Sequence, residues 1–73
     1  MVPRDQFVNK IRALHYTYKQ QLKRTFQYRK VGGTHYIYVP MADLLEEEFV
    51  TSALQQAGCT LEEIRAFLSS AKN

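Results

Sequence analysis

The chain has 73 residues, of which 45% are hydrophobic, and its formal net charge is +3. A chain of this length forms one domain, residues 1–73, which buries only about 60% of the surface exposed by the unfolded chain. The hydrophobic content excludes intrinsic disorder, and no apolar run is long enough for a transmembrane helix. The opening residues lack the apolar segment of a secretory signal. We therefore expect a soluble, cytoplasmic domain with no membrane partner.

Charge is divided unevenly along the chain. Residues 1–36 hold eight Lys and Arg against one Asp, which gives +7, whereas residues 37–73 hold two against six Asp and Glu, which gives −4. A basic half of this kind is typical of a protein that faces a polyanion such as RNA. The simpler alternative is that basic residues only keep a small domain in solution.

Cysteine and histidine are too few and too scattered for a metal centre. Cys59 is the lone cysteine, so no internal disulfide can form. One cysteine and two histidines at unrelated spacings do not match a zinc site. We expect no metal and no cofactor, and we expect Cys59 to be a small buried hydrophobe.

The first third of the chain predicts a helix followed by a strand. Pro3 suits a first helical turn, and hydrophobic residues recur at helical spacing over residues 3–14. Residues 16–22 alternate between polar and apolar side chains, as a strand does. The Lys23–Arg24 pair then forms the bend into the next strand.

Residues 25–40 have the composition of a β-hairpin centred on Gly32 and Gly33. A two-residue loop there places Val31 opposite Thr34. Counting outward gives five further cross-strand pairs: Lys30 with His35, Arg29 with Tyr36, Tyr28 with Ile37, Gln27 with Tyr38 and Phe26 with Val39. Since side chains alternate across a strand, one face is predicted to enter the core: Phe26, Tyr28, Ile37 and Val39. The other face is polar and aromatic: Gln27, Arg29, Tyr36 and Tyr38.

The remaining residues predict two helices. Asp43 is placed to cap the first of them, with Glu46 completing a capping box. Gly58 ends that helix. Thr60 and Glu63 form a second capping box. The last helix is predicted to bury one face, made of Leu61, Ile64, Phe67 and Leu68.

The predicted order is one helix, three strands and two helices. We therefore expect an α+β fold of the α-β-β-β-α-α type, in which a three-stranded antiparallel sheet has helices packed on one face.

The polar and aromatic face of the predicted sheet has the side chains of an RNA-binding surface. Tyrosine rings can stack on unpaired bases while Arg and Lys contact phosphates. The predicted RNA-binding residues are Lys10, Lys19, Lys23, Arg24, Arg29, Lys30 and Tyr36. Tyrosine is also a good strand former, and aromatic and arginine side chains are equally typical of protein interfaces. A helix-turn-helix over residues 50–67 is disfavoured, because Glu62 and Glu63 would face phosphates.

His35 is the candidate catalytic residue. His35 is predicted to lie opposite Lys30, and this neighbouring cation would disfavour the imidazolium form and keep the ring available as a base. Such a base could activate a ribose 2′-hydroxyl while Arg29, Lys30 and Lys23 stabilise the extra negative charge. The alternative is a partly exposed strand histidine at the edge of the core.

Three segments, together spanning nearly the whole chain, carry a family resemblance. They are residues 7–14 (Phe-Val-Asn-Lys-Ile-Arg-Ala-Leu), residues 38–40 (Tyr-Val-Pro) and residues 49–58 (Phe-Val-Thr-Ser-Ala-Leu-Gln-Gln-Ala-Gly). The chain resembles the HicA-like (YcfA-like) mRNA interferase toxins, small proteins with a double-stranded-RNA-binding-domain-like fold. The resemblance implies metal-independent RNA cleavage assisted by a histidine, and inhibition by a HicB-type antitoxin.

Two segments compete for the family's catalytic signature, Gly-Ser-His followed by an alternating strand. Residues 33–37 match it locally, and His35 would then be the catalytic residue. Counting back across the hairpin instead places the signature at residues 24–26, where Phe26 stands in place of histidine. We favour the second placement, because only it leaves room for the hairpin that follows the signature. RNA binding is expected on either placement, and cleavage only on the first. On the second, the alternative is a catalytically inactive relative that acts as a protein-interaction or RNA-binding module.

Overall fold

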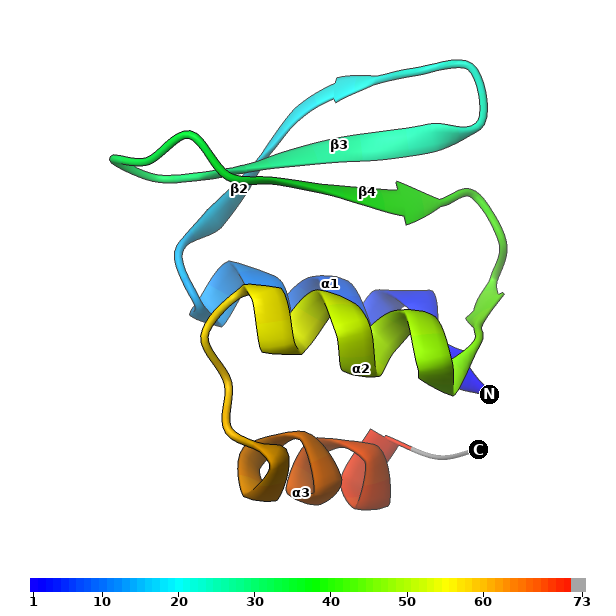
Figure 1. The fold of residues 1–73 in the computed structure, drawn as a ribbon. Helices are drawn as coiled ribbons and strands as arrows, with labels where there is room; N and C mark the ends of the chain where they lie inside the picture. Colours follow the sequence, from blue (N-terminus) through cyan, green and yellow to red (C-terminus); the bar gives the residue numbers. More distant parts are fainter. Residues whose placement is uncertain (72–73) are drawn as a thin grey trace.

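The structure is a computed structural model that describes residues 1–71. Its elements in chain order are β1 (Val2–Pro3), α1 (Arg4–Ala13), β2 (Tyr16–Gln21), β3 (Thr25–Lys30), β4 (Tyr36–Pro40), β5 (Leu44–Leu45), α2 (Glu47–Gln56) and α3 (Leu61–Ala71). β2, β3 and β4 form an antiparallel sheet with β3 in the middle. Figure 1 shows α1 and α2 beneath this sheet and α3 beneath them. The predicted α+β fold with its three-stranded sheet is confirmed.

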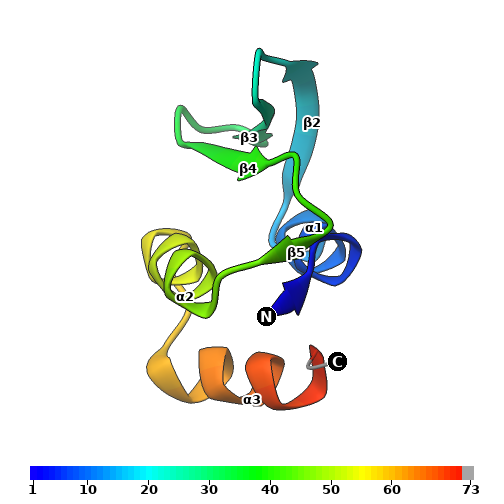
Figure 2. The same cartoon turned by 90° about the vertical axis from the view of Figure 1, so that its right-hand side faces the viewer.

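The core lies between the sheet and the helices. Figure 2 shows α1 on the β2 side and α2 on the β4 side, with β1 and β5 between them. The fully buried large side chains come from every layer: Val2, Phe7, Ile11, Val39, Leu45, Val50, Leu54 and Ile64. Each contributes about 1.5–3 kcal/mol of hydrophobic stabilisation. The ring of Phe7 meets that of Phe49 edge-on at 5.6 Å between centroids, which joins α1 to α2.

The hairpin of β3 and β4 has the predicted pairing, from Phe26 opposite Val39 to Arg29 opposite Tyr36. Its loop differs from the prediction. The Gly33 N–H donates to the Lys30 carbonyl at 3.1 Å, so the turn is centred on Val31 and Gly32 rather than on the two glycines. Gly32 has a φ of +76°, which glycine adopts readily.

Val31 does not pair with Thr34 across the hairpin. Its N–H donates instead to the carbonyl of His15 at 2.8 Å, at the start of β2. The loop therefore contains residues 31–35, longer than predicted, because Val31 is held by the neighbouring chain segment. The register is unchanged, since the Lys30 N–H still donates to the His35 carbonyl.

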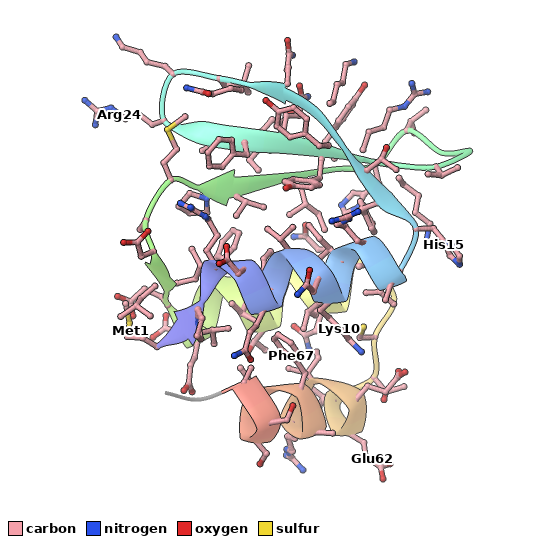
Figure 3. The ribbon with its side chains drawn as sticks, turned by 180° about the vertical axis from the view of Figure 1, so that it is seen from behind. Met1, Lys10, His15, Arg24, Glu62 and Phe67 are labelled. Atoms are coloured by element: carbon pink, nitrogen blue, oxygen red, sulfur yellow. The ribbon has the colours of Figure 1, made fainter. Side chains whose placement is uncertain are left out.

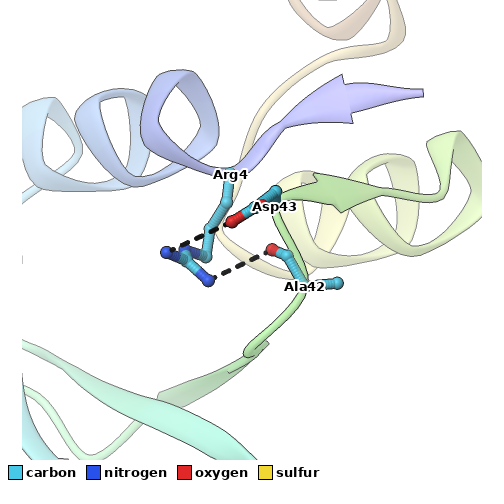
Figure 4. A network of polar contacts seen from close by, with 3 residues as sticks. All are labelled: Arg4, Ala42 and Asp43. Atoms are coloured by element: carbon cyan, nitrogen blue, oxygen red, sulfur yellow. Dashed lines mark hydrogen bonds and ion pairs between the residues drawn. The ribbon is translucent and has the colours of Figure 1, made fainter.

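A second, two-stranded sheet was not predicted, and it corrects the start of α2. Residues 44 and 45 pair with Val2 and Pro3 as β5. The helix consequently begins only at Glu47, with Glu46 as an extended N-cap that makes no side-chain capping bond. The predicted capping box of Asp43 and Glu46 is therefore wrong. The Asp43 carbonyl instead accepts the Arg4 N–H at 2.8 Å, and the Asp43 carboxylate lies 4.0 Å from the Arg4 guanidinium (Figure 4).

The connection from α2 to α3 follows the predicted chemistry. Gly58 has a φ of +98°. The N–H groups of Gly58 and Cys59 donate to the carbonyls of Gln55 and Leu54, which is a Schellman motif. Thr60 and Glu63 exchange the two hydrogen bonds of a capping box, at 2.8 and 3.1 Å.

The buried face of α3 is rotated from the predicted one. Ile64 is buried and Phe67 and Leu68 pack partly against the core, but Leu61 is 54% exposed. Ala71 is buried instead. Because α3 packs against α2 and β1 rather than the sheet, the first residue of the helix projects past its partners.

The Thr60–Glu63 capping box predicts a pH dependence of stability. Hydrogen bonds from the Thr60 backbone and side chain lower the pKa of Glu63 below its ordinary value of 4.5. Because the pKa is lowered in the folded state, the contribution of Glu63 is present above pH 4.5 and is lost as pH falls through the folded value. Urea unfolding at pH 7 and pH 3 should show this loss in the wild type and a smaller loss in Glu63→Gln.

Glu62 provides the matched control. It lies in the same first turn of α3 and is exposed, without the bonds to Thr60. Glu62→Gln should keep the wild-type dependence of stability on pH. If Glu63→Gln lost as much stability between pH 7 and pH 3 as the wild type does, the pH dependence could not come from the capping box.

A substitution at His15, just after the end of α1, should stabilise the protein. His15 follows the helix with a φ of +72°, in the left-handed region that costs non-glycine residues energy. The His15 N–H donates to the Arg12 carbonyl and the His15 carbonyl accepts the Val31 N–H, and glycine would keep both of these bonds. We expect His15→Gly to raise the free energy of unfolding by about 0.5–1 kcal/mol, measured by urea denaturation. His15→Val should lower it, and equal stabilities of the two variants would refute the strain.

Candidate nucleic-acid interface

The face of the β2-β3-β4 sheet that points away from the helices, here called the outer face, is the candidate interface. It carries Lys19 from β2, Gln27 and Arg29 from β3, and Tyr36 and Tyr38 from β4. In Figure 3 side chains stand above the sheet on this side, and within residues 1–71 no helix covers it. The alternation predicted from the sequence is thus the reason why these residue types share one surface.

A row of amides and a phenol crosses the outer face. The Gln20 side-chain amide donates to the Gln27 carbonyl oxygen at 2.7 Å. The Gln27 amide in turn donates to the Tyr38 hydroxyl at 3.4 Å. Gln27 is only 7% exposed although it lies on the outer face, because its two neighbours cover it. The row therefore holds the Tyr38 side chain in place, and Tyr38 as a residue remains 48% exposed.

A second row places cations beside the other ring. The Lys19 ammonium lies 5.1 Å from the centroid of the Tyr36 ring and donates to its hydroxyl at 3.3 Å. A bulge between Tyr18 and Gln20 brings Lys19 to this position. Arg29, directly opposite Tyr36, is anchored by a bond from Nε to the Gly33 carbonyl at 3.3 Å. Its terminal amino groups remain available for an anion.

Lys23 and Arg24 extend the positive charge past one end of the sheet. They form the turn between β2 and β3, which closes through the Leu22 N–H and the Thr25 carbonyl at 2.8 Å. Both are exposed, and Figure 3 shows Arg24 pointing away from the sheet at that end.

The other two predicted lysines do not join the outer face. The Lys30 ammonium donates to the Leu14 carbonyl at 2.7 Å and lies 5.2 Å from the centroid of Tyr16, on the helix side of the sheet. Lys10 lies on the side of α1 that faces α3 (Figure 3). The basic residues predicted to bind RNA are therefore divided among several faces of residues 1–71 and do not form one continuous surface.

His35 occupies the helix side of the sheet, at the junction of α1 and β2. Its Nδ1 is joined by a hydrogen bond to the Tyr16 hydroxyl, and the two rings meet edge-on. Burial raises the pKa of Tyr16, so this hydroxyl stays protonated. Lys30 is nearby, as predicted, but Arg29 points to the opposite face and Lys23 lies at the other end of the hairpin. The predicted catalytic group of His35 with Arg29, Lys30 and Lys23 is not assembled.

No metal centre or membrane span is found within residues 1–71. His, Cys, Asp and Glu side chains form no group of three or more that could hold an ion there. No helix of this part is long and apolar enough to cross a membrane. Cys59 is partly buried, and burial raises the pKa of its thiol, as expected of a packing residue rather than a nucleophile.

Sequence reasoning did not identify a cleft on the other side of the sheet, between α1 and the β2–β3 hairpin. It is lined by Arg4, Asp5, Val8, Asn9, Arg12, Tyr18, Phe26 and Tyr28. The recurrence of Arg4, Val8 and Arg12 at intervals of four residues on a predicted helix was the available signal. The aromatic half could not be foreseen, because it depends on how far β2 extends beyond α1.

Comparisons with protein-family models, with curated proteins and with solved structures found no match to this chain. The resemblance to the HicA-like toxins therefore stays a prediction.

The contact between Tyr16 and His35 predicts an energetic coupling. If His35 is a structural residue, Tyr16→Phe and His35→Ala should each lower the free energy of unfolding, and the double variant should lose less than their sum. We expect a coupling energy of about 0.5–1.5 kcal/mol from urea unfolding. Tyr16→Phe combined with Arg65→Gln, a distant exposed site on α3, should be additive. Additivity in both cycles would contradict a structural role.

Proposed function

We propose that this protein binds single-stranded RNA on the outer face of its sheet. The observation that carries the proposal is the pair of rings of Tyr36 and Tyr38, which lie side by side with Lys19 and Arg29 next to them. The ring centroids are 6.3 Å apart and the planes differ by 33°, so the two rings present similarly inclined surfaces. Successive unpaired bases can stack on such a pair.

Charge supports the same surface. Arg29 lies opposite Tyr36 and the Lys19 ammonium lies over the Tyr36 ring, so both cations are within reach of the phosphates of a strand stacked on this face, and Lys23 and Arg24 continue the positive charge beyond the turn. β3 spans six residues, or about 20 Å of surface. A short stretch of single strand therefore fits, whereas paired bases would hide the faces that the rings need.

The choice of RNA over DNA rests on the resemblance to the HicA-like toxins. The resemblance also implies nuclease activity and a HicB-type antitoxin, and neither is part of the proposed function. His35 lies on the helix side of the sheet and its Nδ1 is engaged by Tyr16. RNA held on the outer face would not reach it, so we propose binding without cleavage assisted by His35.

Affinity for a short single-stranded RNA at several salt concentrations tests the proposal. Arg29→Gln should weaken binding and reduce the slope of log K against log salt by about 0.7, because one phosphate contact is lost. Tyr38→Leu should cost about 1–3 kcal/mol with the slope unchanged, because stacking is lost instead. Tyr38→Phe keeps the ring and should bind nearly as the wild type does.

Arg65→Gln is the matched control for charge, since it removes one exposed cation from α3. It should leave the slope near the wild-type value. If Arg29→Gln and Arg65→Gln lost the same affinity for RNA, net charge alone would explain the binding. Absence of binding at low salt, or preference for a duplex, would refute the proposal. RNA cleavage that disappears in His35→Ala would show that the first placement of the signature is right.

A further inference from the structure

The cleft between α1 and the β2–β3 hairpin has a volume of about 400 Å³. It lies on the helix side of the sheet and contains none of the residues assigned to the outer face. One wall is a single stripe of α1, since Arg4, Val8 and Arg12 follow one another at intervals of four residues. Asp5 and Asn9 complete that wall.

The opposite wall is aromatic. Tyr18 meets Tyr28 edge-on at 5.8 Å between centroids and lies 6.4 Å from Phe26. Tyr28 is buried, whereas Tyr18 is 55% exposed, because β2 extends beyond the helix that covers its neighbours. The Tyr18 ring thus offers an open aromatic surface inside a cleft, which a planar group can use for stacking.

The two arginines of the cleft differ in the contacts that their guanidinium groups make with the rest of the chain. The Arg4 guanidinium lies 5.3 Å from the centroid of Phe26, donates to the Ala42 carbonyl at 3.2 Å and approaches Asp43, as Figure 4 shows. It closes one end. Arg12, at the other end, is exposed, and no hydrogen bond or ion pair of its side chain is found among residues 1–71. It remains able to bind an anion in a bidentate manner.

Distances along the helix set the size of the ligand. Arg4 and Arg12 are eight residues apart, or about 12 Å along α1. Asn9 and Asp5 lie between them and can hydrogen-bond the edge of a planar heterocycle, as amides and carboxylates do with bases. The cleft therefore combines an aromatic wall, polar edge groups and one free guanidinium within the length of a single nucleotide.

We propose that this cleft binds one nucleotide, with the base stacked on Tyr18 and the phosphate held by Arg12. Arg4 limits how deeply the base enters, and Asn9 and Asp5 contact its edge. The site is separate from the outer face and does not depend on the function proposed for it.

Adenosine 5′-monophosphate is the probe, titrated into the ¹⁵N-labelled full chain and followed by NMR. Amide signals of Arg12, Tyr18 and Phe26 should shift saturably, and those of Tyr36 and Tyr38 should shift less. Arg12→Gln should weaken binding of the nucleotide about tenfold while leaving adenosine unaffected. Tyr18→Leu should weaken both ligands, since both use the ring.

Controls separate this site from the outer face. Tyr38→Leu should bind the mononucleotide as the wild type does even if it loses RNA, and Arg65→Gln should bind as the wild type does. Unchanged dispersion of the amide spectrum shows that each variant is folded. Shifts confined to the outer face, equal affinity for ribose 5-phosphate and the nucleotide, or no saturable binding would each overturn the proposal.

Discussion

The antiparallel register between β3 and β4 is the constraint on which both surfaces of the sheet depend. Side chains alternate along each strand, so a slip of β3 by one residue would turn Tyr28 outward and bury Arg29, and a slip of β4 would turn Ile37 and Val39 outward. Main-chain hydrogen bonds at the loop prevent the slip: the Lys30 N–H donates to the His35 carbonyl and the Val31 N–H donates to the His15 carbonyl. Burial of Val39 and Ile37 against the helices then stabilises the same register. The outer face is therefore a consequence of core formation.

Helix α1 serves the core and the cleft at once. Phe7 and Ile11 are fully buried, whereas the adjacent stripe from Arg4 to Arg12 forms one wall of the cleft. This division is possible because β2 is an edge strand and its Tyr18 extends past the helix. On the same face of the sheet but toward its other edge, α2 lies beneath β4 (Figure 2), and its first turn carries Glu47 and Glu48 near the positive end of the helix dipole.

Local chemistry was sufficient wherever a few neighbouring residues determine the backbone. Thr60 and Glu63 form a capping box in any helix that begins there, and Gly58 can adopt the left-handed conformation that other residues avoid. Where a prediction failed, a contact with a distant segment of the chain decided the outcome. Asp43 could have capped a helix, but pairing of β5 with β1 competes for the same segment, and this pairing joins residues more than 40 positions apart.

The sequence alone determined the order of the main elements, the pairing of β3 with β4 and the residues that share the outer face, because alternation and capping are properties of short segments. Tertiary structure decided which partners the remaining charges meet. Lys30 lies on the helix side by the same alternation that places Tyr28 there, but its bond to the Leu14 carbonyl depends on where α1 ends. Lys10 faces α3 because of the way α1 packs. It also created the cleft between α1 and Tyr18, since a concave surface requires two elements whose distance no local pattern specifies.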